Sequence, residues 1–249
     1  MPDGTGIQIR TLSTTREFEE AVRLQRRIWG FQELEILPVR FFVVASGVGG
    51  QTFGAFDGER MIGFLLAIPG LKPGGKLYIH SHMTGVLEEY RNRGVGRMLK
   101  LRQREDALAR GFDLVEWTFD PLELKNAWFN LERLGAIVRR YVLNQYGTTT
   151  SHLHGGLPTD RCVAEWWIRS PRVEGIISGR PLPRPPVEAT IEVPADIARI
   201  KREDPRHARA IQQRISERFL ELLDAGLTVT GFERTPAAGV YLLSRFHSE

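Results

Sequence analysis

The stretch that most constrains the fold of this chain is EEYRNRGVGRML, residues 88–99, a turn that holds two glycines and three arginines. It follows KLYIHSHMTGV (residues 76–86), which has strand character, and it leads into an amphipathic helix predicted over residues 94–109. The first N–H groups of a helix lack acceptors within the helix and carry a partial positive charge. The sequence therefore predicts a strand, a tight turn and a helix whose first turn can hold a phosphate.

The residues after the glycines exclude two common phosphate motifs. A Walker loop requires a lysine and then a serine or threonine after its last glycine, whereas Arg97 and Met98 follow here. A dinucleotide fingerprint requires a third glycine at the position of Leu99. The pattern that remains is R-x-x-G-x-G.

This pattern suits close approach of an anion to the backbone. Gly94 and Gly96 carry no side chain that would keep the anion away, and Arg91, Arg93 and Arg97 can add charge from the sides. The other interpretation is a glycine-rich turn that binds nothing.

Composition narrows the class of protein. Hydrophobic residues make up 42% and charged residues 26% of the 249 residues, as in ordinary globular domains. No apolar run approaches the ~20 residues of a membrane helix, and the N-terminus lacks an apolar signal core, so we expect a cytoplasmic protein with no membrane partner. The net charge of +4 is too mild to favour a nucleic-acid partner. The single cysteine, Cys162, and the absence of a metal-protease histidine motif predict no metal site.

Residue periodicity predicts an alternation of strands and helices through the first 170 residues. The expected order is strand, two helices, three strands, helix, strand, helix and two strands. The expected strands are 7–12, 51–56, 61–68, 76–86, 112–119, 136–143 and 161–168, and the expected helices are 15–29, 37–45, 94–109 and 122–134.

A segment rich in proline and arginine, residues 171–187, predicts a linker between a main domain (1–170) and a C-terminal extension (188–249). The extension is predicted as strand, helix, strand, strand over residues 189–194, 205–225, 227–232 and 240–246. Two interpretations stay open for it: a degenerate half-repeat of the main domain, or an unrelated element that docks on the main domain or on a second subunit.

The R-x-x-G-x-G turn resembles the acyl-CoA pyrophosphate loop of the GNAT superfamily of N-acyltransferases, and the element order over residues 7–168 matches that family. The segment AWFNLERLGA (127–136) is similar to the family segment that follows its fifth strand. The resemblance implies an α/β (α+β) fold, a GNAT-like splayed mixed sheet flanked by helices, here with a small C-terminal β-α-β-β extension.

The resemblance also implies an acyl-CoA donor, acetyl-CoA or another thioester such as succinyl-CoA. Backbone groups around Thr84 and Val86 would pair with the pantetheine arm, and the N–H groups of residues 91–97 would hold the pyrophosphate. The residues expected to bind acyl-CoA are Thr84, Val86, Arg91, Asn92, Arg93, Gly94, Val95, Gly96, Arg97, Asn126 and Asn130.

His80 and His82 are the candidate catalytic residues. Two positions apart on a strand, they should point to one face, and histidine has a pKa suited to accepting a proton from an attacking amine. The arylalkylamine N-acetyltransferases of the superfamily have a similar His-x-His pair, and other members have a glutamate at the position of His80. The alternative is that both histidines are packed, hydrogen-bonded strand residues.

One departure from the family concerns the general acid. The tyrosine that protonates the leaving thiolate in the family should fall at Leu131, and leucine cannot donate a proton. Tyr141 or Tyr146 could serve instead, the thiolate could leave unassisted, or the protein could bind acyl-CoA without turning it over.

The function expected from the resemblance is acyl transfer to a small amine. An amino acid is one candidate acceptor, because an arginine-lined pocket would suit its carboxylate. Glu33, Glu35 or Asp160 would suit the amine, and His152 and His154 lie in a polar loop of the same region. A homodimer is one expected assembly. The alternative function is a non-catalytic acyl-CoA-binding or regulatory protein.

Overall fold

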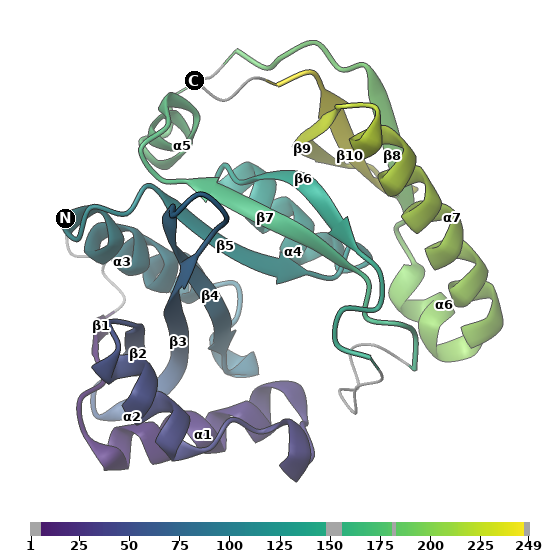
Figure 1. Ribbon diagram of the computed structural model, residues 1–249. Coiled ribbons are helices and arrows are strands. Elements are labelled where there is room, and N and C mark those ends of the chain that lie inside the picture. The colour runs from purple at the N-terminus through teal and green to yellow at the C-terminus, as the bar shows by residue number, and fades with distance from the viewer. Residues whose placement is uncertain (1–5, 148–155, 181–182, 247–249) are drawn as a thin grey trace. The chain divides into compact units, whose positions relative to one another are not determined.

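The computed structural model describes residues 6–147, 156–180 and 183–246 (Figure 1). The chain forms two compact units that divide inside strand β5 (Leu114–Phe119), after Val115. We call them the N-terminal and the C-terminal unit and describe each by itself. Among the described residues, no helix is both long and apolar enough to cross a membrane.

The N-terminal unit is an antiparallel sheet covered by helices on both faces. Its strands lie in the order β1 (Ile7–Thr11), β2 (Gln51–Asp57), β3 (Arg60–Leu71) and β4 (Leu77–Val86). Its helices are α1 (Thr15–Trp29), α2 (Val39–Gly47) and α3 (Val95–Ala109), with short 3-10 turns η1 (Glu33–Glu35) and η2 (Glu88–Tyr90).

The alternation of side chains along the strands decides which helix covers which face. Phe64 of β3 packs edge-on against Trp29 of α1, at 5.8 Å between ring centroids, and lies 6.0 Å from Phe42 of α2. Phe53 of β2 points the other way, and Arg102 of α3 lies over its ring at 5.3 Å. Helices α1 and α2 therefore cover one face, and α3 covers the other.

Helix α1 spans the predicted residues because both of its ends carry strong stop signals. Thr14 and Glu17 form a reciprocal capping box at the N-terminus, and Gly30 adopts the left-handed conformation at the C-terminus. The buried stripe repeats at helical spacing and consists of Phe18, Ala21, Leu24, Gln25 and Ile28.

A buried polar network attaches α3 to the sheet. Lys100 Nζ donates to Gln103 Oε1 at 2.6 Å and to Ser81 Oγ on β4 at 3.1 Å. Gln103 Nε2 donates to Gln51 Oε1 on β2 at 2.9 Å, and Gln51 Nε2 donates to Asp106 Oδ2 at 2.8 Å. Burial lowers the pKa of Lys100 well below its ordinary value. The network therefore fixes α3 along its length by directional bonds rather than by apolar packing alone.

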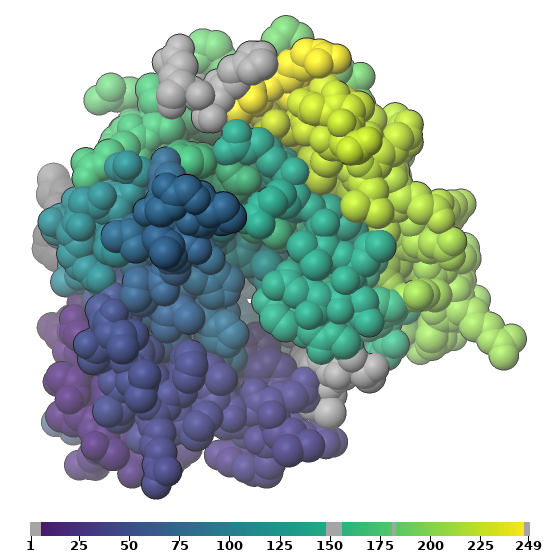
Figure 2. All heavy atoms as spheres, viewed as in Figure 1, coloured from purple at the N-terminus to yellow at the C-terminus, as the bar shows by residue number. Residues whose placement is uncertain are grey.

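The C-terminal unit holds a mixed arrangement of six strands. Their order is β5, β7 (Arg161–Trp167), β6 (Ile137–Val142), β9 (Thr228–Arg234), β10 (Ala238–Ser244) and β8 (Ala189–Pro194). Its helices are α4 (Leu124–Trp128), α5 (Pro171–Ile177), α6 (Ile197–Glu203) and α7 (Pro205–Asp224), and a π-helical turn, η3 (Phe129–Arg133), follows α4. In Figure 2 the yellow-green atoms of α7 and the yellow atoms that follow it in the chain lie side by side on the visible face.

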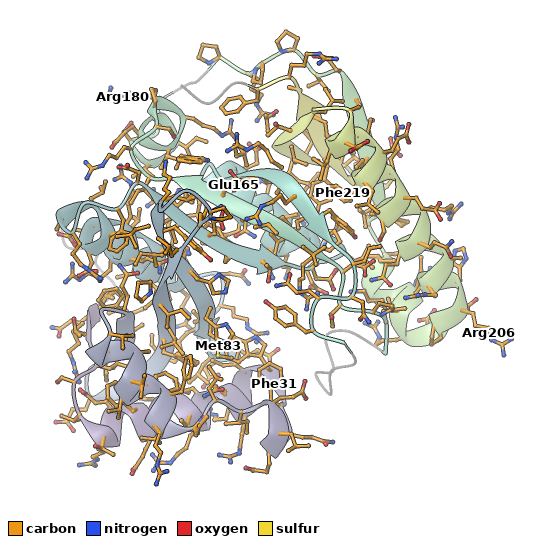
Figure 3. All side chains as sticks on the ribbon, in the orientation of Figure 1. Phe31, Met83, Glu165, Arg180, Arg206 and Phe219 are labelled. Atoms are coloured by element: carbon orange, nitrogen blue, oxygen red, sulfur yellow. The ribbon has the colours of Figure 1, made fainter. Side chains whose placement is uncertain are left out.

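An aromatic cluster joins the C-terminal extension to residues 116–147 within this unit. Phe219 of α7, labelled in Figure 3, stacks on Tyr141 at 4.8 Å and meets Tyr241 edge-on at 5.0 Å. Tyr241 is fully buried, and its hydroxyl donates to the carbonyl of Pro121 at 2.7 Å. The extension thus shares one core with the strands β6 and β7.

Three local features differ from the sequence-based expectation. Helix α5 occupies the first part of the segment predicted as a linker, because Ser170 caps it and Pro171 takes the first helical position, where proline is tolerated. Helix α6 adds a second helix to the extension, which was predicted to hold one. The predicted helix 122–134 ends in the π-helical turn, where Leu134 N–H donates to the Phe129 carbonyl. The proposed division into domains at residues 171–187 stays a prediction.

Removing the side-chain amide of Gln103, at the centre of the network around α3, should destabilise the protein. Gln103→Leu should lower the free energy of unfolding by about 2 kcal/mol, because Lys100 and Gln51 lose buried partners. Urea denaturation measures this change. Glu105→Gln, on the exposed side of the same helix, is the control and should stay within about 0.5 kcal/mol of the parent protein. Equal stability of the two variants would contradict the role given to the network.

Candidate functional site

The turn before α3 ends in a helix N-terminus that lacks a protein cap. Asn92 and Gly94 both adopt left-handed backbone conformations, with φ of 63° and 82°, and Met98 N–H donates to the Gly94 carbonyl at 3.0 Å. The N–H groups of residues 95–97 precede that first helical bond, so the helix itself supplies them no acceptor. No described side chain caps α3, and its first turn has no acidic residue. This end of the helix suits an anion.

The two glycines leave the approach to this helix end open. A Cβ atom added at Gly94 or at Gly96 would meet no described atom within 4 Å. Gly94 requires its residue type because of its positive φ, whereas Gly96 has helical conformation and no such requirement. Close packing within the protein therefore does not explain why residue 96 is a glycine.

Neighbouring contacts hold the turn and direct its arginines. The hydroxyl of Tyr90 donates to Asp57 Oδ2 at 2.7 Å, and the guanidinium of Arg93 lies over the Tyr90 ring at 5.1 Å. Arg60 pairs with Glu89 at 2.6 Å, and Arg91 Nε donates to the Val86 carbonyl at 3.4 Å. Arg91 and Arg93 are exposed, so their charge is available to a ligand.

A β-bulge in β4 positions His82. Leu66 pairs with Met83 and Ala67 pairs with Ser81, so His82 is the extra residue between two paired positions. Bulges redirect side chains and are common beside active sites. Met83, labelled in Figure 3, marks this point of the strand.

Aromatic rings surround the two histidines in the N-terminal unit. The centroids of the His80 and His82 rings are 6.0 Å apart, Tyr78 lies 6.5 Å from His80, and Phe41 of α2 lies 6.3 Å from His82. The surrounding protein lowers the pKa of His82 by desolvation, and the charge of His80 lowers it further. His82 nevertheless keeps an exposed surface, which a proton acceptor needs.

Phe41 and Tyr78 were not anticipated as neighbours of these histidines. Tyr78 continues the same every-second-residue spacing as His80 and His82, so the sequence held a signal for it. Phe41 comes from another element, and nothing in the sequence indicates its proximity.

The predicted acyl-CoA residues fall into both units. Thr84 and Val86 lie on β4 beyond the bulge, paired with Leu65 and Gly63, and residues 91–97 follow in the turn and the start of α3. One continuous segment of the N-terminal unit thus carries the histidines and residues 91–97, which we call the anion turn. Asn126 and Asn130 belong to the C-terminal unit, where Asn126 is exposed on α4 and Asn130 is buried in η3.

The two candidate tyrosines, Tyr141 and Tyr146, both belong to the C-terminal unit but differ in burial. Tyr141 is buried, its hydroxyl is 2.9 Å from Ser216 Oγ, and burial raises its pKa well above the ordinary value. Tyr146 is 49% exposed, with its hydroxyl 2.9 Å from Thr118 Oγ1. Leu131 is fully buried. Of the two tyrosines, Tyr146 is therefore the one that is exposed to solvent.

Asp160, considered as a ligand for the acceptor amine, has a structural role. It is buried, and it accepts hydrogen bonds from the Asn144 N–H at 2.8 Å and from Ser216 Oγ at 2.6 Å. His152 and His154 lie outside the described residues. Within the described ranges, no group of three or more His, Cys, Asp or Glu side chains could hold a metal ion.

Comparisons with known proteins give a family match and several similar folds. Residues 16–136 match the family model described as the acetyltransferase (GNAT) family. No curated protein matches the chain. Solved structures with similar folds include the ribosomal-protein-S18-alanine N-acetyltransferase from Escherichia coli, with 18% identity and a TM-score of 0.51, over 65% of this chain and 94% of that chain.

Two further solved structures show the same likeness. NAA60 of Arabidopsis thaliana, solved in complex with acetyl-CoA, is 17% identical with a TM-score of 0.52, over 65% of this chain and 99% of that chain. A GNAT-family protein from Desulfovibrio desulfuricans is 15% identical with a TM-score of 0.53, over the same shares of the two chains. At these identities the likeness shows the fold, an open mixed sheet flanked by helices. Residues 16–136, just under half of the chain, thus match the GNAT acetyltransferase family, and the solved structures share its fold.

Proposed function

We propose that the protein is an acyl-CoA-dependent N-acyltransferase that passes an acetyl or succinyl group directly to a small amine. The observation that carries the proposal is the uncapped N-terminus of α3, which follows the histidine-bearing strand β4 after a turn with exposed arginines. The N–H groups of residues 92–97 would hold the pyrophosphate of the donor, whereas the Arg91 N–H, predicted to join them, donates to the Glu88 carbonyl at 3.0 Å. Thr84 and Val86 would pair with its pantetheine arm through their backbone groups.

His82 is the proposed general base. Direct transfer needs the amine nitrogen to lose a proton as its lone pair attacks the thioester carbon and the carbon–sulfur bond breaks. A histidine with a lowered pKa is neutral at pH 7 and can accept that proton, directly or through a water molecule. His80 would tune His82, because its charge contributes to the lowered pKa.

The departing thiolate would take a proton from a general acid or leave unassisted. Leu131, where the family tyrosine was expected, cannot protonate the departing thiolate, and Tyr141 is buried with a raised pKa. Tyr146 is exposed and takes the role here, or the thiolate leaves unassisted. The buried Leu131 also favours the second candidate function, a protein that binds acyl-CoA without turnover. A small amine acceptor, a cytoplasmic location and a homodimer remain predictions.

Thermal unfolding with acetyl-CoA, succinyl-CoA, propionyl-CoA and free CoA tests the donor site. A thioester at about a hundred times its dissociation constant should stabilise the native state by about 2.7 kcal/mol. The preferred thioester then goes into a thiol-release assay with a panel of amines and amino acids. Stabilisation with release supports the enzyme, and stabilisation without release from any amine supports the binding protein. No stabilisation by any thioester would count against the donor site itself.

Gly96→Ala should move stability and donor affinity in opposite directions. Alanine favours a helix by up to about 1 kcal/mol over glycine, and its methyl group meets no protein atom, so the free protein should be more stable. The same methyl group should obstruct the anion and reduce the thermal shift produced by CoA. Gly47→Ala, in α2 with equally open surroundings, is the control and should leave the CoA shift unchanged. Undiminished CoA binding by Gly96→Ala would remove this turn from the donor site.

The lowered pKa of His82 predicts the acid side of the pH–rate profile. Only the neutral imidazole accepts a proton, so kcat/KM should fall at acid pH with an apparent pKa below the ordinary 6.5 of histidine. We call this fall the acid limb of the profile. His82→Gln should abolish this limb and lower kcat/KM by about a hundredfold or more. His80→Gln should shift the limb upward towards 6.5, because a charge that opposes protonation of His82 is gone.

The exposed His207, on α7, provides the matched control for these profiles. His207→Gln should leave both the limb and kcat/KM as they are. A limb that persists unchanged in His82→Gln would assign the base to another group.

A further inference from the structure

The exposed side of α7 carries a group of arginines that no carboxylate neutralises. Arg206, Arg209 and Arg214 are exposed, and among the described residues none of the three has a carboxylate within ion-pair distance. Arg209 Nη1 donates to the neutral Gln212 Oε1 at 3.4 Å, which leaves its charge unbalanced. We call these three arginines, with the exposed Ala210 among them, the arginine face of α7.

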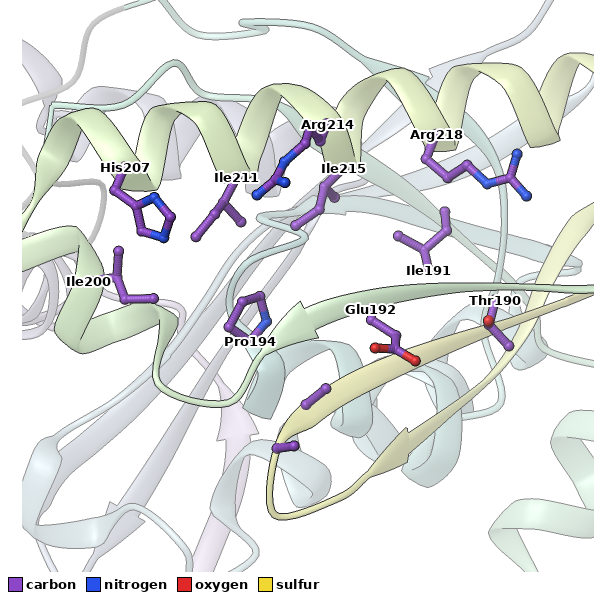
Figure 4. Close-up of a pocket in the computed structure, with 12 residues that line it drawn as sticks. Thr190, Ile191, Glu192, Pro194, Ile200, His207, Ile211, Arg214, Ile215 and Arg218 are labelled. Carbon is purple, nitrogen blue, oxygen red and sulfur yellow. The ribbon is translucent and has the colours of Figure 1, made fainter.

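The opposite side of α7 is fixed in the core of the C-terminal unit. Figure 4 shows Ile211 and Ile215 projecting from α7 towards β8, and both are buried. Phe219 of the same helix contacts the rings of Tyr141 and Tyr241, at 4.8 Å and 5.0 Å. The helix therefore cannot rotate to bring its arginines to a partner inside the unit.

The acidic residues that flank the arginine face in the chain do not serve it. Each of them has another partner, and the pairs are Glu203 with Arg199, Asp204 with the His207 N–H, Glu217 with Gln213 and Glu221 with Arg218. Carboxylates thus lie at both ends of the face, and their contacts direct them to other groups.

The placement of these arginines is unfavourable for the helix itself. A helix carries partial positive charge at its N-terminus, so cations in its first turns destabilise it. Arg206 lies in the first turn of α7, which holds no acidic residue. Arg206 and Arg209 are also three positions apart, a spacing at which like charges repel each other. Residues that break such local rules without a structural gain are typical of functional surfaces, and an anionic occupant would offset both costs.

A hollow of about 530 Å³ beside the face can receive an acidic side chain. Arg206 and Arg209 line it together with Pro205 and Leu157, and none of its described lining residues is acidic. Arg206 and Arg214 lie about 12 Å apart along the helix axis, at 1.5 Å per residue. An extended chain covers this distance in about four residues. A short run of acidic residues therefore has the length to span the face.

We propose that the arginine face of α7 binds a short acidic segment of a partner protein, whose carboxylates pair with Arg206, Arg209 and Arg214. A guanidinium group binds a carboxylate through two parallel hydrogen bonds, so arginine suits this ligand better than lysine does. None of the three arginines takes part in the proposed transfer reaction, and the proposal does not depend on the donor or on the amine.

Two other anionic partners fit this face less well. A nucleic acid would continue past it and bring phosphates to Glu203 at one end and to Glu217 at the other. Phe219 of α7 is buried and cannot stack on a base. A bilayer would gain little, because Ala210 and Gln213, the exposed residues among the arginines, offer no large apolar side chain to the lipid.

Fluorescence anisotropy with labelled hexapeptides tests the proposal on the full chain. The probe is EEEEEE, and KKKKKK is its charge control. We expect EEEEEE to bind, and KKKKKK to bind at least about tenfold more weakly, because its charges repel the arginines. Added salt should weaken the binding of EEEEEE, since the pairs form at an exposed surface.

Three variants locate the binding site. Arg206→Glu, Arg209→Glu and Arg214→Glu should each weaken EEEEEE about fivefold or more, because each replaces an attraction by a repulsion. Arg180→Glu is the matched control, since this exposed arginine after α5, labelled in Figure 3, undergoes the same change of charge outside α7. It should leave binding within about twofold of the parent protein. Circular dichroism confirms that each variant is folded.

The melting temperature separates a binding role from a structural one. Arg206→Glu should raise the melting temperature of the free protein by about 1–3 °C, because an acidic residue in the first turn suits the helix dipole. Weaker peptide binding by a more stable protein is the result we expect. A fall in the melting temperature would give Arg206 a structural role and count against the proposal.

Further results would overturn the proposal. Absence of EEEEEE binding to the parent protein would do so, as would an equal loss of binding in Arg180→Glu. Binding that is weakened in Arg206→Glu and Arg209→Glu but unchanged in Arg214→Glu would assign the hollow to a compact anion. Tighter binding of an RNA hexanucleotide or of phosphatidylserine vesicles than of EEEEEE would assign the face to a nucleic acid or to a membrane.

Discussion

The buried chain of hydrogen bonds from Ser81 through Lys100 and Gln103 to Gln51 is the interaction on which the candidate site depends. It crosses from β4 to α3 to β2, so it fixes the helix against the strand that carries the histidines. A buried amine without partners would cost several kcal/mol, and each bond in the network therefore restricts where the helix can lie. The position of the anion turn relative to β4 follows from this restriction.

With α3 held in this way, its N-terminus can do without a cap. Thr14 caps α1, Ser170 caps α5 and Asp204 caps α7, whereas no described side chain caps α2, α3, α4 or α6. A cap typically stabilises a helix by about 1 kcal/mol, so its omission has a cost that the network on the same helix offsets. The N–H groups that remain open are those that a phosphate can use. The hydrogen-bond network along α3 thus contributes stability, and the open N-terminus of the same helix is available to bind an anion.

Local sequence signals predicted much of this arrangement, and the rest depends on contacts between distant residues. The glycines and arginines of residues 91–97 and the capping signals of α1 are local, and the strand, turn and helix that they predict are present. The bulge at His82 was not predicted, because it depends on how β4 pairs with β3. The π-helical turn after α4 was missed for a similar reason. Residues 129–133 have ordinary helical character, and the extra residue in this turn of the helix depends on packing against other elements. That turn includes Leu131, so it changes the direction of this side chain relative to a regular α-helix.

The contact between Tyr241 and Pro121 joins residues that are 120 positions apart, and Glu132 bonds the Phe232 N–H across 100 positions. The strands β5 to β7 are synthesised well before the segment that completes their core. Their apolar surface stays uncovered until the later elements α7, β9 and β10 have been synthesised. Late closure of such long loops slows folding and lengthens the time for which the chain is open to aggregation.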